Sequence, residues 1–293
     1  MTNMTIEQVI LMLLQVVLFI SALTLGFKAT LSEPFFLFRR PQIFIRTFLA
    51  MYVVVPVVAG IILSLVPLPV GVKTGVILLA ISPVAITAPQ KMLALGANPA
   101  YVYSLLITMS LISVIVVPIS LTILTALPLT HDASIPSFEV VKIIAQTILL
   151  PLFIGIIIRR FAPRIAERLS QPLNSISGKV LLVSLLALLV LNLGGFAKAG
   201  VLSLIVVLVL AAVALVAGHL LGGPALGDRT ALTMASTQRQ MAIATLIAAI
   251  NFPGTVTLDV IVMYLIMSIL VIIPYTKWCK KKQQQQSVGQ AQT

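Results

Sequence analysis

The stretch TMASTQRQMAIATLIAAI, residues 233–250, is apolar along most of its length but has serine, threonine, glutamine and arginine side chains at its centre. The connection before it ends near Arg229, so Arg239 lies roughly 15 Å into the segment at the rise of an α-helix. An apolar segment of this length is long enough to cross a bilayer. We therefore predict a membrane-spanning segment with a polar centre.

The composition of the whole chain is that of a polytopic membrane protein. Of its 293 residues 60% are hydrophobic and only 9% are charged, which lies outside the range of soluble proteins. Dividing the chain at charged residues, prolines and glycines predicts an all-α fold of about nine membrane-spanning helices. The predicted spans are residues 6–27, 43–66, 72–96, 99–128, 138–159, 175–195, 200–222, 229–251 and 255–276.

A second predicted span is interrupted as well. The stretch ISPVAITAPQKMLALGAN, residues 81–98, contains Pro83 and Pro89, and each proline removes a backbone donor and clashes with the preceding turn. We predict that both are helix breaks. In a membrane, free backbone groups are tolerated only where protein or a water-filled cavity satisfies them. Two interrupted spans in corresponding halves of a chain are the best sequence pointer to the binding site of a secondary transporter.

Polar residues at the two interruptions form the predicted substrate site. They are Thr87, Gln90, Lys91, Ser236, Thr237, Gln238, Arg239 and Gln240. Two cationic side chains and the positive N-terminal ends of half-helices favour an anionic substrate. Two alternatives stay open, because Arg239 can instead clamp backbone carbonyls and Lys91 can extend to the membrane interface.

Basic residues in the short connections predict the orientation of the chain. Pairs and runs such as Arg39 and Arg40, Arg159 and Arg160, and residues 280–282 fall on one side, which is the cytoplasmic side by the positive-inside rule. The N-terminus is then outside and the C-terminus inside the cell (inner) membrane. Residues 1–278 form a single transmembrane domain, and the glutamine-rich residues 279–293 are expected to be a disordered cytoplasmic tail.

Several other function classes do not fit the sequence. The basic residues are dispersed and lack interleaved aromatic residues, so nucleic acid is not an expected partner. A single cysteine, Cys279, provides no disulfide framework and no multi-cysteine metal site. The motifs GxSxG and HExxH are absent. We expect no enzyme activity, cofactor or metal; the expected partners are the lipid bilayer and a small organic anion, whose identity stays open, as does the oligomeric state.

Three stretches of the chain resemble the bile acid:sodium symporter family. They are LFISALTLGFKATLSEPFFLFRRPQIFIRTFLAMYVVVPVVAGIIL, SPVAITAPQKMLALGANPAYVYSLLITMSLISVIVVPISL and STQRQMAIATLIAAI. The resemblance implies a core domain, of helices near residues 43–128 and 200–276, and a panel domain, of helices near residues 6–27 and 138–195. It also implies that two broken helices cross in the core, and that one domain moves against the other to give alternating access.

The resemblance also identifies where sodium ligands are missing. The positions that typically provide side-chain ligands to sodium in the family are occupied here by Ala88, Pro89, Val102, Leu106, Ala235 and Arg239. Sodium requires oxygen donors, and an arginine repels a cation. Our hypothesis is that Arg239, together with Lys91, permanently supplies the positive charge that bound sodium supplies in coupled relatives.

The predicted function is therefore a secondary transporter for a small or amphipathic organic anion that lacks the usual sodium sites. One alternative is a sodium-coupled organic anion symporter that uses backbone ligands. Another is a channel or sensor built on the same fold. Saturable uptake with counterflow separates a transporter from a channel.

Overall fold

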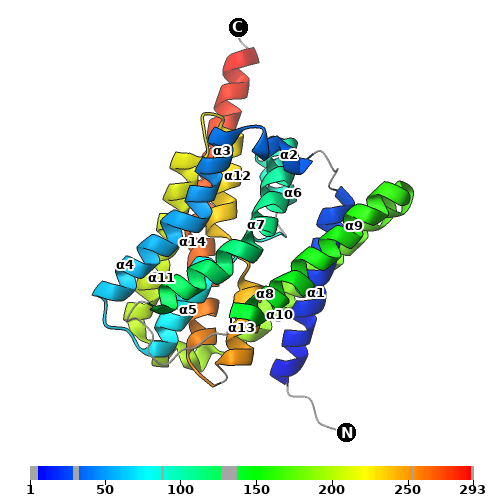
Figure 1. The fold of residues 1–293 in the computed structure, drawn as a ribbon. Helices are drawn as coiled ribbons and strands as arrows, with labels where there is room; N and C mark the ends of the chain where they lie inside the picture. The colour runs from blue at the N-terminus through cyan, green and yellow to red at the C-terminus, as the bar shows by residue number, and fades with distance from the viewer. Residues whose placement is uncertain (1–5, 29–32, 87–88, 127–136, 253, 292–293) are drawn as a thin grey trace.

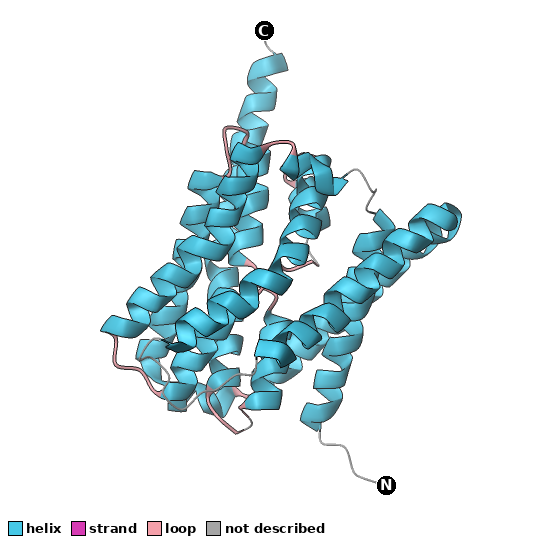
Figure 2. Ribbon diagram, in the orientation of Figure 1, coloured by secondary structure: helices cyan, strands magenta, loops and turns pink. Residues whose placement is uncertain are grey.

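The computed structural model of the chain describes residues 6–28, 33–86, 89–126, 137–252 and 254–291, and Figure 1 shows how its helices are arranged. In these ranges the regular elements are helices (Figure 2), which confirms the predicted all-α class. The first half consists of α1 (Ile6–Lys28), α2 (Glu33–Phe38), α3 (Pro41–Phe48), the π-helical η1 (Leu49–Val54), α4 (Val55–Leu65), α5 (Val70–Ile81), α6 (Pro89–Ala94) and α7 (Pro99–Ala126). The second half consists of α8 (Ser137–Ile144), the π-helical η2 (Ala145–Leu149), α9 (Leu150–Phe161), α10 (Pro163–Leu191), α11 (Leu193–Leu221), α12 (Leu226–Thr237), α13 (Met241–Asn251) and α14 (Thr257–Ala291).

The described residues contain seven helical stretches that are long and apolar enough to cross a membrane. The predicted spans 72–96 and 229–251 are each divided into two shorter helices, α5 with α6 and α12 with α13. One helix start differs clearly from the prediction. The connection between the predicted spans 138–159 and 175–195 is largely helical, since α10 begins at Pro163, and a proline is well suited to the first turn of a helix.

Two groups of helices can be distinguished by their packing. Helix α1 packs along α9 and α10, on the right in Figure 1, whereas α11 packs along α12 and α14, on the left. These helices lie in the ranges expected for the panel and the core, respectively. The division into two domains that move stays a prediction.

Helices α1 and α9 approach each other at two glycines. A Cβ atom on Gly26 would collide with the carbonyl oxygen of Leu152, and one on Gly155 would collide with that of Leu23. The two backbones are therefore in direct contact. Small residues at such crossings are typical of helix pairs in membranes, where close packing replaces the hydrophobic effect as the main attraction.

The start of α1 and the end of α14 lie at opposite ends of the bundle (Figure 1). The predicted sides of the membrane for the two termini stay a prediction. Helix α14 continues to Ala291, so residues 279–291, which we expected to be disordered, are helical in the structure. Lysine and glutamine are good helix formers, and here they extend a helix that is already nucleated within the bundle.

Candidate functional site

The two broken helices meet at their breaks. Val84 and Arg239 form an isolated antiparallel bridge. The N–H of Ala85 donates to the carbonyl of Gln238 at 3.2 Å, and the N–H of Gln240 donates to the carbonyl of Pro83 at 2.9 Å. Each break therefore provides hydrogen-bond partners for backbone groups of the other break, and such partners are required in the interior of a membrane.

The sequence explains where each break falls. Helix α5 ends at Ile81, two residues before Pro83, and α6 begins at Pro89. The residue before a proline is disfavoured in the helical region, which accounts for the extended backbone of Ser82, with φ of −56° and ψ of 140°. Helix α12 ends at Thr237 without a proline, and α13 begins at Met241.

Arg239 lies at the crossing with 2% of its surface exposed. Its Nη1 donates to the carbonyl of Ser82 at 3.1 Å, and its Nη2 donates to the carbonyl of Met51 at 2.8 Å. Its Nε has no hydrogen-bond partner among the described residues. The side chain thus clamps two backbone carbonyls, as the structural alternative for Arg239 expected, and its Nε stays without a hydrogen-bond partner among the described residues.

The carbonyl of Met51 is available because of a proline five residues later. Met51 lies in η1, and in a π-helix a carbonyl accepts from the N–H five residues ahead. That residue is Pro56, which has no N–H. Arg239 supplies the donor that the proline lacks, and so connects η1 to the crossing.

Two buried tyrosines hydrogen-bond to backbone carbonyls near the crossing. The hydroxyl of Tyr264, in α14, donates to the carbonyl of Thr237 at 2.9 Å. The hydroxyl of Tyr52 donates to the carbonyl of Met109 at 2.7 Å. Tyr264 therefore holds the end of α12, whereas Tyr52 connects η1 to α7. Neither the two tyrosines nor the Met51 carbonyl was predicted from the sequence; Pro56, five residues after Met51, was the signal for the carbonyl.

Four buried polar atoms in residues 237–245 have no partner among the described residues. They are Oγ1 of Thr237, Nε of Arg239, Nε2 of Gln240 and Oγ1 of Thr245. They flank or lie within the first turns of α13, whose N-terminal end carries partial positive charge. Buried unpaired donors are rare in native proteins. This part of the crossing can therefore donate hydrogen bonds to an anionic group.

The remaining predicted site residues are placed differently. Ser236 is buried, but its hydroxyl donates to the carbonyl of Leu232 at 2.7 Å. Gln238 is partly buried and contributes its backbone to the bridge. Gln90 and Lys91 are exposed on α6, away from the buried set around Arg239. Thr87 lies outside the described residues.

Three of the positions where the resemblance expects sodium ligands lie together. Val102, Leu106 and Ala235 are fully buried and belong to one apolar cluster that also contains Val84. Their side chains offer no oxygen to a cation. In the part of the chain that the structure describes, no group of three or more histidine, cysteine, aspartate or glutamate side chains could hold a metal ion.

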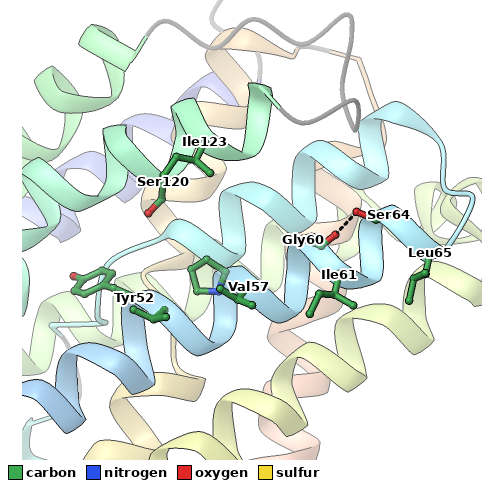
Figure 3. Close-up of a pocket in the computed structure, with 10 residues that line it drawn as sticks. Tyr52, Val57, Gly60, Ile61, Ser64, Leu65, Ser120 and Ile123 are labelled. Atoms are coloured by element: carbon green, nitrogen blue, oxygen red, sulfur yellow. Dashed lines mark hydrogen bonds between the residues drawn. The ribbon is translucent and has the colours of Figure 1, made fainter.

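A groove of about 500 Å³ runs between the η1–α4 segment and α7 (Figure 3). It extends from Tyr52 to Leu65, with Ser120 and Ile123 on its α7 side. Most of its lining atoms are carbon, and the Ser64 hydroxyl donates to the carbonyl of Gly60 at 2.8 Å. None of the predicted site residues that the structure describes lines this groove, but Tyr52, which does, directly follows Met51, whose carbonyl accepts from Arg239.

Comparison with known proteins places the chain in a family. The model of the Sodium Bile acid symporter family matches residues 15–199, a range that contains the first broken helix and ends before the second. No curated protein matches the chain. Since the matched range covers more than half of the sequence and the predicted all-α membrane fold is confirmed, the chain belongs to the sodium bile acid symporter family.

Proposed function

We propose that this membrane transporter moves a small or amphipathic organic anion by alternating access, and that Arg239 replaces bound sodium at the crossing. The observation that supports this proposal most directly is the contact of the Arg239 guanidinium with the carbonyls of Ser82 and Met51. Carbonyls of unwound helices are typical ligands of coupling ions in transporters. Here the covalently attached guanidinium of Arg239 already uses the carbonyl of Ser82, at a helix break, and that of Met51, in η1.

The same geometry argues against a sodium-coupled symporter that relies on backbone ligands. A sodium ion beside Arg239 would meet a like charge in a site from which water is largely excluded, where the repulsion is screened less than in water. The apolar side chains of Val102, Leu106 and Ala235 add no compensating oxygen. Transport that does not depend on sodium is therefore the favoured form of the proposal.

An anionic substrate group fits the unpaired donors at the crossing. No carboxylate among the described side chains forms an ion pair with Arg239. The ion pair found among them is between Arg159 and Glu167. The Nε of Arg239 and the Nε2 of Gln240 are buried and unpaired. A carboxylate or sulfonate at the crossing can accept a hydrogen bond from either nitrogen, and charge-assisted bonds of this kind are roughly twice as strong as neutral ones.

Uptake into proteoliposomes tests the proposal. The full chain is reconstituted and uptake of radiolabelled cholate, a steroid carboxylate, is measured in sodium buffer and in choline buffer, below the concentration at which cholate forms micelles. Saturable uptake with counterflow, equal in the two buffers, is expected. A strict sodium requirement overturns the sodium-independent mechanism, and flux without saturation or counterflow indicates a channel.

A further inference from the structure

The turn between α9 and α10 carries an excess of positive charge. Four arginines lie within ten residues here, namely Arg159, Arg160, Arg164 and Arg168. Arg159 donates to the carboxylate of Glu167 at 2.9 Å in an ion pair. The other three side chains are exposed and form no hydrogen bond or ion pair with the part of the chain that the structure describes. Three positive charges are therefore available to a partner from outside the chain.

This turn lies beyond the apolar part of α10. The helix has 29 residues and is roughly 43 Å long, whereas the hydrocarbon core of a bilayer is ~30 Å thick. Residues 180–191, at its far end, contain no charged side chain, so this end belongs in the hydrocarbon. Because charged side chains are costly there, Arg164 and Arg168 lie at the level of the lipid headgroups. Figure 1 shows the α9–α10 turn projecting away from the other helices.

Helix α10 has two parallel stripes of exposed side chains at this level. Arg164 and Arg168 are four residues apart, as are Ile165 and Leu169, so the members of each pair lie one turn apart on the same face. Ile165 is 54% exposed and Leu169 is 41% exposed. Ala166, in contrast, is fully buried and marks the face that packs on the protein. A basic stripe therefore lies beside an exposed apolar stripe, and neither belongs to the packed face.

The chemistry of the two stripes favours an amphipathic anion as the partner. A guanidinium can donate two parallel hydrogen bonds to a phosphate or a carboxylate, and exposed apolar side chains beside basic ones are typical of contact with a membrane surface. A second copy of the chain is a poor source of the anionic groups, because the sequence has only seven acidic residues against nineteen lysines and arginines. An anionic phospholipid provides both the phosphate and the acyl chains.

We propose that the α9–α10 tip, made of Arg160, Arg164, Ile165, Arg168 and Leu169, is a binding site for an anionic phospholipid. Arg164 and Arg168 bind the headgroup phosphate, with Arg160 as a further donor, and Ile165 and Leu169 contact the acyl chains. The positive-inside rule places these arginines on the cytoplasmic side, where anionic lipids give the membrane a negative surface potential. The site does not involve the helix crossing and does not depend on what the protein transports.

Photolabelling with a lipid tests the site. The full chain is reconstituted in phosphatidylcholine vesicles that contain a trace of phosphatidylglycerol with a photoreactive group on one acyl chain. After illumination the labelled peptides are identified by mass spectrometry, which measures labelling of the α9–α10 tip separately from the rest of the protein. The variants are Arg164→Gln and Arg168→Gln. The matched control is Arg39→Gln, which changes an exposed arginine on the same predicted side of the membrane.

We expect label in the first turns of α10 in the wild type and in Arg39→Gln. Unlabelled phosphatidylglycerol should displace it, whereas an equal amount of phosphatidylcholine with the same acyl chains should not. Each glutamine variant should reduce the labelling by about fivefold, the loss expected for one basic residue at an anionic membrane surface. Arg164→Lys and Arg168→Lys should reduce it less, because the charge is kept and only the bidentate geometry is lost. They also provide the comparison if a glutamine variant does not fold.

Four contrary results would each overturn the proposal. The first two are absence of label from α10 in the wild type and undiminished labelling of the two glutamine variants. The third is an equal loss of labelling in Arg39→Gln, which would mean that the general surface charge attracts the lipid. The fourth is displacement of the lipid by soluble glycerol 3-phosphate, which would assign the arginines to a free phosphate. A failure of sodium-independent cholate uptake with intact labelling would concern the proposed function alone.

Discussion

The guanidinium of Arg239 and the carbonyl of Met51 form a hydrogen bond of 2.8 Å between residues that lie 188 positions apart in the chain. The bond exists because Pro56 cannot satisfy that carbonyl and because the break after α12 directs Arg239 toward η1. It makes one cationic side chain the connection between a π-helical segment and two broken helices. The consequences for stability and for anion binding can be measured separately.

Replacing Arg239 with alanine is expected to reduce both stability and anion binding. The carbonyls of Ser82 and Met51 would lose their donor, at about 1–3 kcal/mol each. The free energy of unfolding should fall accordingly, and cholate should no longer raise the thermal unfolding temperature, as a ligand specific for the folded state otherwise does. The control is Lys91→Ala, at an exposed position, which should leave the unfolding temperature unchanged. Retained cholate affinity in Arg239→Ala would reduce Arg239 to a structural clamp.

Replacing Gln240 with leucine is expected to change stability and affinity in opposite directions. Removing a buried amide whose nitrogen is unpaired should stabilise the free protein, because the unmet cost of burying that donor disappears. Cholate affinity should fall by about tenfold or more, since a hydrogen bond to a charged group is worth about 1.5–3 kcal/mol. Thermal unfolding with and without cholate measures both quantities. Thr245→Val is the matched isosteric change for the unpaired Oγ1 of Thr245. If Gln240→Leu lowers the free energy of unfolding and leaves the cholate affinity unchanged, the Gln240 amide does not bind the anion.

Tyr264→Phe and Tyr52→Phe are expected to have similar effects on stability and different effects on binding. Each change removes one buried hydrogen bond and should lower the free energy of unfolding by about 0.5–1.5 kcal/mol. Only Tyr264 holds the carbonyl of Thr237 at the crossing, so Tyr264→Phe alone should weaken cholate binding. Equal effects of the two variants on the cholate Kd would show that the Tyr264 hydroxyl has no special role in positioning the crossing.

The glycine contact between α1 and α9 should not tolerate even a methyl group. Gly26→Ala and Gly155→Ala place a Cβ against backbone atoms of the partner helix, and overpacking of this kind typically costs about 1–3 kcal/mol. Gly178→Ala in α10 is the control, since nothing lies within 4 Å of the added Cβ. It should be neutral or stabilising by about 0.5–1 kcal/mol through helix propensity. Thermal unfolding of the three variants measures this difference, and equal unfolding temperatures would exclude a tight α1–α9 contact.

The helices and their interruptions could largely be read from local sequence. Pro83 and Pro89 indicated one break, and the polar run before Met241 indicated the other. Family membership is confirmed, but its match ends before Arg239, so the assignment of that residue rests on geometry. Its partners could not be predicted, because a pairing across the fold depends on which backbone carbonyls lack a donor. For Lys91 the sequence was misleading in the other direction. Its charge and its position in a predicted span suggested a site residue, but its side chain is exposed because of the way α6 packs.

The bridge between the breaks also constrains how the protein can be made. Ser82 is synthesised 157 residues before its partner Arg239, a delay of roughly 8–30 s at ~5–20 residues per second. During that interval the first break has free backbone groups that water or the translocation machinery must satisfy. A chain that ends before Arg239 lacks the partner for these backbone groups and therefore keeps an unpaired helix break.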